Sequence, residues 1–120
     1  YVELLQMFLF AARRSTSELI EAPRLAVVFS CWDELNGDAI TPEKLLAERL
    51  PLLDAFIRST WQEGSWSVWG LSSLGRALRN EEPDEDFRTH GPQKFGYVLR
   101  PGETTQDPDL TSPVAWLLGV

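Results

Sequence analysis

Two short polar segments of this chain follow apolar runs and carry its strongest candidates for ligand binding. The run Leu25–Phe29 breaks into Ser30-Cys31-Trp32-Asp33, and the run Ser67–Leu71 breaks into Ser72-Ser73-Leu74 before Gly75. Carboxylates accept hydrogen bonds, and hydroxyls and backbone N–H groups donate them. Because the carboxyl ends of parallel strands meet at one edge of a sheet, where ligands bind, the two segments predict one shared site.

These residues also have plain structural interpretations. An Asp after a strand often caps a turn, so Asp33 alone does not establish a site. Cys31 is typical of a small buried hydrophobe, and as a nucleophile it lacks a base because His90 is expected in a distant, solvated loop. The acidic run Glu81–Asp86 could attract a divalent ion, but contiguous acids in a loop are usually solvated. Four tryptophans are expected as core residues or a helix-end anchor rather than a stacking platform: Trp61, Trp66, Trp69 and Trp116.

Composition excludes several classes of function. The chain has 120 residues, 43% of them hydrophobic, and five tryptophans, which is typical of one folded domain. Its formal charge of −7 repels phosphate backbones and anionic lipids, so neither nucleic acid nor a membrane is expected as the main partner. One Cys and one His exclude an intrachain disulfide and a closed zinc site, which fits a cytoplasmic location.

The segments that position the two polar tips alternate between helix and strand. The expected elements are a helix over Val2–Ile20, a strand over Leu25–Phe29, a helix from a Thr41 cap to Ile57, a strand over Ser67–Leu71, a short edge strand over Phe95–Leu99 and a helix over Val114–Leu118. Pro51 is expected to kink or restart the middle helix, and Arg79–Pro92 indicates an exposed loop. This order predicts an α/β fold, a partial three-layer sandwich with a small, mainly parallel sheet and flanking helices.

The first predicted helix is apolar on most of its surface. Glu3, Gln6, Arg13 and Ser17 lie along one narrow polar stripe of this helix. Its opening apolar segment is shorter than the roughly 20 residues that cross a bilayer. We therefore expect this helix to be buried against a protein partner or a missing amino-terminal half. On that expectation residues 1–120 form a single, truncated domain.

The succession of segments resembles the second half of a P-loop GTPase, and most closely the bacterial double-GTPase group of the TRAFAC class. That group has a strand followed by TKWDEL, a proline-containing helix, a strand followed by G-x-S-x-x-G, a glycine-rich piece and a closing P-x-x-W-L-L helix. The matching segments here are VVFSCWDEL, TPEKLLAERLPLLDAFI, VWGLSSLG, FGYVLRPGE and LTSPVAWLL. The resemblance covers nearly the whole chain.

The resemblance implies a guanine nucleotide, GTP or GDP, as the ligand. The family's fourth motif falls on Ser30–Asp33, where the carboxylate of Asp33 would accept hydrogen bonds from guanine N1–H and the exocyclic amine. Cys31 stands where the family has a Lys that packs over the base. The fifth motif falls on Ser72, Ser73 and Leu74, where a backbone N–H near Ser73 would bind guanine O6.

The family's phosphate-binding parts are missing from this sequence. It contains no G-x-x-x-x-G-K-[ST] and no D-x-x-G, so no loop here holds the phosphates or Mg²⁺. We expect base recognition without hydrolysis of GTP, and Mg²⁺ only together with the missing phosphate-binding half. The alternative is a non-enzymatic α/β interaction module with a degenerate nucleotide site, in which the first helix docks on a partner.

Overall fold

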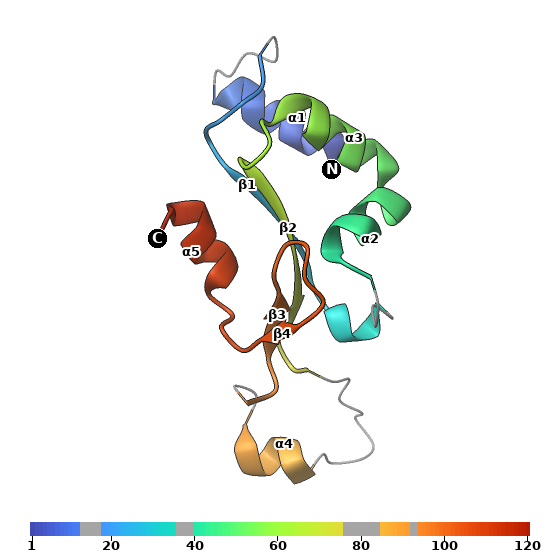
Figure 1. The fold of residues 1–120 in the computed structure, drawn as a ribbon, viewed down its shortest axis with the longest axis vertical. Coiled ribbons are helices and arrows are strands. Elements are labelled where there is room, and N and C mark those ends of the chain that lie inside the picture. The colour runs from blue at the N-terminus through green and yellow to red at the C-terminus, as the bar shows by residue number, and fades with distance from the viewer. Residues whose placement is uncertain (13–17, 36–39, 76–84, 92–93) are drawn as a thin grey trace.

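The computed structural model describes residues 1–12, 18–35, 40–75, 85–91 and 94–120, with the side chains of residues 86 and 87 excepted. The elements, shown in Figure 1, are α1 (Val2–Ala11), β1 (Leu25–Phe29), the 3₁₀ turn η1 (Trp32–Glu34), α2 (Pro42–Arg49), α3 (Pro51–Thr60), β2 (Trp66–Ser72), α4 (Glu85–His90), β3 (Tyr97–Leu99), β4 (Gln106–Asp107) and α5 (Ser112–Leu118). They form an elongated molecule of about 54 × 30 × 25 Å. The α/β fold class is confirmed.

The sheet has the strand order β1-β2-β3-β4 and is mixed rather than mainly parallel. Only β1 and β2 run parallel, with Leu25 opposite Trp66 and Phe29 opposite Gly70. The other two pairs are antiparallel. The connection between β3 and β4, residues 100–105, is too short for a parallel crossover, which takes a dozen residues or more. The parallel pair therefore exists only where the helices α2 and α3 supply a crossover.

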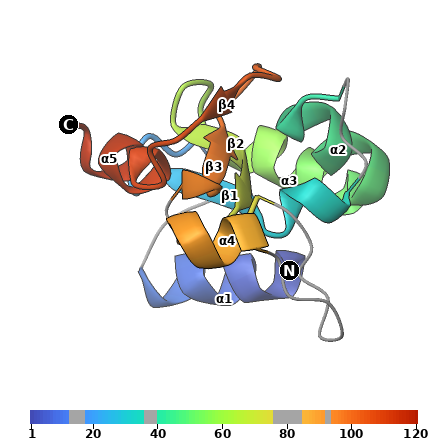
Figure 2. The ribbon, with the colours of Figure 1, turned by 90° about the horizontal axis from the view of Figure 1, so that it is seen from below.

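The helices lie on both faces of the sheet. Seen from below in Figure 2, α2 and α3 lie on one side of the sheet and α5 on the other, which gives the expected three layers. The main core fills the space between the sheet and α3, with α1 packed against α3. Its buried members are Leu9, Ile20, Leu46, Leu53, Ile57, Trp61 and Val68. The indole of Trp61 also donates a 2.9 Å hydrogen bond to the carbonyl oxygen of Pro23, which ties the start of β1 to the end of α3.

Prolines set the helix boundaries on the crossover. Thr41 caps α2 by accepting a 3.4 Å hydrogen bond from the backbone N–H of Lys44, and Pro42 takes the first helical position. Leu50 leaves the helical region at φ −131°, and Pro51 starts α3. The proline thus restarts the helix, one of the two outcomes that the sequence predicts.

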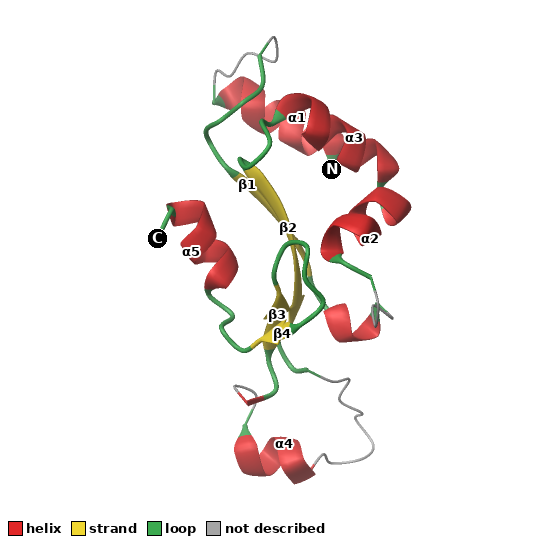
Figure 3. Cartoon of the chain, in the orientation of Figure 1, coloured by secondary structure: helices red, strands yellow, loops and turns green. Residues whose placement is uncertain are grey.

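Four expectations about the elements were wrong or incomplete. The first helix does not reach Ile20, which instead exchanges backbone hydrogen bonds with Thr60 and Gln62. The strand β3 lies between β2 and β4 rather than at an edge. The strand β4 has no counterpart among the predicted elements. Within the predicted loop over 79–92, residues 85–90 form α4, which extends away from the sheet (Figure 3); residues 79–84 and 92 of that loop lie outside the described residues.

Candidate functional site

Asp33 and Ser72, the polar residues at the carboxyl ends of the two parallel strands, meet directly. The hydroxyl of Ser72 donates a 2.5 Å hydrogen bond to Oδ1 of Asp33, across a sequence separation of 39 residues. Parallel pairing brings them together, because Phe29 and Gly70 are partners in the register and each chain leaves the sheet shortly afterwards. The structure therefore brings these two members of the predicted segments to one place.

Ser72 fixes both segments at once. Its side chain is buried at 1% exposure, and its oxygen also accepts a 2.8 Å hydrogen bond from the backbone N–H of Gly75. Gly75 has φ +73°, and a Cβ at this position would lie 2.2 Å from the carbonyl oxygen of Phe95. Only glycine fits this close backbone approach without strain. The turn after β2 is thus held by the Ser72 hydroxyl and passes close to the Phe95 backbone.

Cys31 turns the chain after β1. It has φ 54° and ψ 40°, in the left-handed region, and its carbonyl oxygen accepts a 2.9 Å hydrogen bond from the N–H of Glu34. Its side chain is exposed, so the interpretation as a buried hydrophobe is wrong. The reason is geometric: the left-handed residue reverses the chain, and the residue that enters the interior is Trp32 instead.

Trp32 packs on the sheet beneath the site. It is 4% exposed, and its ring lies over Gly70 so closely that a Cβ on Gly70 would come within 2.6 Å of it. Phe29 contacts it with a ring separation of 6.3 Å. Trp32 also belongs to a second core cluster with Leu45, Tyr97 and Leu99. The buried Trp32 side chain therefore anchors the turn and fixes the position of its neighbour Asp33.

A hollow of about 320 Å³ opens beside Asp33. Its described lining comes from three separate parts of the chain: Trp32, Asp33, Gly75, Tyr97, Leu99, Thr104 and Gln106. The last four were missed by sequence reasoning. The alternation of Tyr97 and Leu99 on one face of a strand, followed by a Pro101-Gly102 turn, is the signal that could have placed the hairpin there.

The remaining predicted site residues are neighbours of Asp33 and Ser72 in the two polar segments, but none of them is among the described residues that line the hollow. Ser30, Cys31 and Ser73 are exposed, and Leu74 is half-buried. Ser73 and Leu74 are not among the described lining residues, whereas Asp33 and Gly75 are. The assignment of Ser30, Cys31, Ser73 and Leu74 to ligand binding therefore stays a prediction.

Charged side chains hold the hairpin that forms one wall of the hollow. The guanidinium of Arg100 contacts Oδ2 of Asp107 at 2.7 Å across the β3–β4 pair. The pKa of Asp107 is lowered from its ordinary value, first by the hydrogen bond from the N–H of Asp109 and then by that from Arg100. Hydrogen bonds from the side chain and N–H of Thr111 lower the pKa of Asp109 in turn. The wall thus carries fixed charges on its outer side.

A match to a family model shows to which protein family this chain belongs. The family model for Double-GTPase 1 matches residues 1–117, which include β1, β2 and both polar segments. The chain belongs to the Double-GTPase 1 family. Comparison with curated proteins and with solved structures found no significant match. The resemblance to the double-GTPase group is confirmed, and the chain is a GTPase-related domain. Its correspondence to the second half of such a domain stays a prediction.

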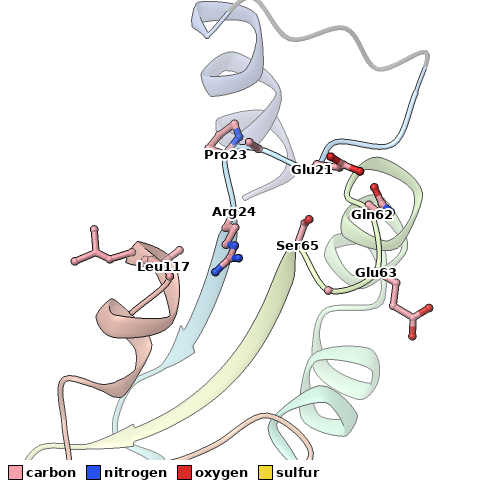
Figure 4. Close-up of a pocket in the computed structure, with 11 residues that line it drawn as sticks. Glu21, Pro23, Arg24, Gln62, Glu63, Ser65 and Leu117 are labelled. Carbon is pink, nitrogen blue, oxygen red and sulfur yellow. The ribbon is translucent and has the colours of Figure 1, made fainter.

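A larger hollow of this double-GTPase domain lies at the opposite ends of the strands. Its volume is about 760 Å³. Figure 4 shows its lining residues on the segment before β1, the turn before β2 and the end of α5. Among the described lining residues the one cation is Arg24, and it already has partners. Its guanidinium donates a 2.8 Å hydrogen bond to the carbonyl oxygen of Trp116 and lies 5.4 Å from the centre of the Trp116 ring. Ligands of α/β sheets bind beyond the carboxyl ends of the strands, so the smaller hollow beside Asp33 is the candidate site.

The described residues contain neither a cluster that could hold a metal ion nor a helix that could cross a membrane. In that part of the chain no three His, Cys, Asp or Glu side chains stand close enough together to hold a metal ion. Of the acidic run Glu81–Asp86, the structure describes the side chain of Glu85 alone, which is exposed. His90 is exposed at the end of α4, with its ring 6.5 Å from that of Phe95. None of the helices described here is both long and apolar enough to cross a membrane.

Proposed function

We propose that this double-GTPase domain binds a guanine nucleotide and recognises its base through Asp33. The observation that carries the proposal is the hydrogen bond from Ser72 to Oδ1 of Asp33 at the edge of the hollow. It orients the carboxylate and leaves Oδ2 without a hydrogen-bond donor among the described residues. Guanine presents two adjacent donors, N1–H and the exocyclic amine, whereas adenine presents an acceptor at N1. A held carboxylate therefore favours guanine.

The other motif residues complete the proposed site. The backbone N–H near Ser73 binds guanine O6, and Leu74 stands at the third position of the fifth motif. Ser30 and Cys31 form the rim on the β1 side, where the exposed Cys31 replaces the Lys that covers the base in the family. A Cys side chain covers less of a base than the four-carbon stem of a Lys, so we expect weaker affinity than in a family member with that Lys.

Catalysis is not part of this proposal. The sequence contains no G-x-x-x-x-G-K-[ST] and no D-x-x-G, so the phosphates and Mg²⁺ need groups from outside these 120 residues. We propose that the domain supplies the base-recognition part of a GTPase-like unit in the cytoplasm, and that hydrolysis depends on those other groups.

The test is a calorimetric titration of the protein that carries this chain with GDP and with ADP. We expect GDP to bind more tightly, and Asp33→Ala to weaken GDP binding by roughly 10- to 100-fold while ADP binding changes little, the magnitude of hydrogen bonds to a charged group. Asp54→Ala is the matched control, because Asp54 is also a half-buried Asp but bonds to Arg58 on α3. Equal binding of GDP and ADP by the unaltered protein, or an Asp33→Ala variant that keeps the preference, would refute the proposal.

A protein-interaction module is the second candidate function. The helix α1 supports it, because Leu4, Met7, Phe8 and Phe10 on its surface are between 55% and 86% exposed. Apolar clusters of this kind on a surface mark contact with another protein surface. In this alternative α1 docks on a partner or on the rest of a GTPase-like unit, and Asp33 only fixes the turn after β1. The titration distinguishes the two candidates, since the module has no preference for guanine.

A further inference from the structure

We propose that Gln106 is a second specificity-determining residue of this site, whose amide oxygen accepts a hydrogen bond from the exocyclic amine of the bound guanine. The inference rests on the proposed function and adds a residue outside the two strand-end motifs. Gln106 lines the same hollow as Asp33 but comes from β4, more than seventy positions along the chain. The two side chains reach the hollow from different walls.

The register of the sheet places Gln106 in the hollow. Gln106 is the direct partner of Leu99 in the antiparallel pair β3–β4, and directly opposite residues share one face of a sheet. Leu99 and Tyr97 pack with Trp32 on that face, in the core cluster beneath Asp33. The face that carries Gln106 is therefore the face on which the turn with Asp33 lies.

The backbone that carries Gln106 is held in place without a ligand. Asp107, its neighbour, contacts Arg100 at 2.7 Å and accepts a 2.9 Å hydrogen bond from the N–H of Asp109. Leu99, its cross-strand partner, is buried at 2% exposure. A side chain on a fixed strand loses less conformational freedom on binding than one on an open loop, which favours recognition.

The amide of Gln106 is available to a ligand. The side chain is exposed at the rim of the hollow, and among the described residues it makes no hydrogen bond. An amide offers one carbonyl acceptor and two N–H donors, whereas a carboxylate such as Asp33 only accepts. The exocyclic amine of guanine has two hydrogens. If Asp33 takes N1–H and one of them, the second points away from Asp33 and needs another acceptor, which the Gln106 oxygen supplies.

The experiment compares GDP with inosine diphosphate, which lacks the exocyclic amine and keeps N1–H. In the protein that carries this chain, we expect Gln106→Ala to weaken GDP binding about threefold to tenfold and to leave inosine diphosphate binding unchanged, the effect of one hydrogen bond to a neutral group. Thr105→Ala is the control, because Thr105 precedes Gln106, does not line the hollow, and bonds to Glu103.

The outcomes separate this inference from the proposed function. If the unaltered protein prefers GDP to ADP and Asp33→Ala removes that preference, but Gln106→Ala keeps the ratio of GDP to inosine diphosphate affinity, the role of Gln106 is refuted and the proposed function stands. If the unaltered protein shows no preference for GDP over ADP, both are refuted. Circular dichroism melting curves of all variants show whether the fold is retained.

Discussion

Replacing Ser72 with Ala tests the central contact of the site by its effect on stability. The change removes the 2.5 Å hydrogen bond to Asp33 and the 2.8 Å hydrogen bond from the N–H of Gly75, at a position with 1% exposure. A hydrogen bond to a charged group contributes about 1.5–3 kcal/mol and a neutral one about 0.5–1.5 kcal/mol. Because Asp33 is half-buried and recovers part of its hydration, we expect a loss of about 2–3 kcal/mol in the free energy of unfolding.

The measurement is urea denaturation of the protein that carries this chain. With a denaturant slope in the usual range of about 1–3 kcal/mol/M, the loss moves the unfolding midpoint down by roughly 0.7–3 M. The matched control is Ser59→Ala, since Ser59 is exposed on α3 and its hydroxyl donates a local hydrogen bond to the carbonyl oxygen of Phe56 three residues earlier. We expect that control to change stability by less than about 0.5 kcal/mol.

A double-mutant cycle of Ser72→Ala with Asp33→Ala isolates the contact itself, because alanine at position 33 removes the acceptor of the hydrogen bond. If Ser72 and Asp33 act as a pair, the two changes together cost less than the sum of the single changes, by about 1 kcal/mol or more. A Ser72→Ala variant as stable as the control variant, or a cycle with no coupling, would refute the reasoning, because the contact would then hold neither segment in place.

Two further predictions concern the turn after β2 and the hairpin. Gly75→Ala combines a left-handed backbone with a Cβ 2.2 Å from the Phe95 carbonyl oxygen, so it should lower the free energy of unfolding by about 3 kcal/mol or more and the melting temperature by roughly 10 °C. The control is Gly102→Ala, which has the same φ of +73° but open space around it and should cost about 1–2 kcal/mol. Equal effects of the two changes would contradict the role of the close approach. Asp107 has a lowered pKa because of the N–H of Asp109 and Arg100, so its contribution to stability is present above its ordinary pKa of 3.8 and is lost as the pH falls through the lower folded value. The stability difference between the unaltered protein and Asp107→Asn should therefore shrink between about pH 4 and pH 2 in urea unfolding curves, and a difference that does not change with pH would contradict it.

The parallel pair was predicted well because the sequence signals there are local. A β-branched apolar run between Pro23 and Ser30 defines β1, whose bounds match the prediction. The bounds of β2 differ by one residue at each end. Parallel pairing of the two strands brings their carboxyl ends to one edge of the sheet, so the order of the elements predicts that the two polar segments lie close together. The hydrogen bond between Ser72 and Asp33 depends in addition on the turn at Cys31 and Trp32.

The hairpin and the hollow could not be predicted in the same way. A strand of two residues, such as Gln106–Asp107, has no periodicity of its own and exists only because it pairs with β3. The place of Thr104 and Gln106 beside Asp33 depends on that pairing and on its register. The exposed side chain of Cys31 could not be predicted either. It depends on a left-handed backbone conformation, which is uncommon for residues other than glycine and leaves no pattern in a single sequence.

The position of Asp33 depends on its neighbour Trp32 as well as on the hydrogen bond from Ser72. The left-handed Cys31 ends β1 and reverses the chain, which lets the Trp32 ring enter the space above Gly70. A residue with a Cβ at position 70 would meet that ring at 2.6 Å, so the glycine in the middle of β2 makes room for the anchor. With Trp32 seated, the 3₁₀ turn directs the Asp33 carboxylate toward the end of β2, where Ser72 donates to it. The site therefore depends on a buried aromatic that lines the hollow and on a glycine that makes room for its ring, and changes at either position should affect recognition through the placement of Asp33.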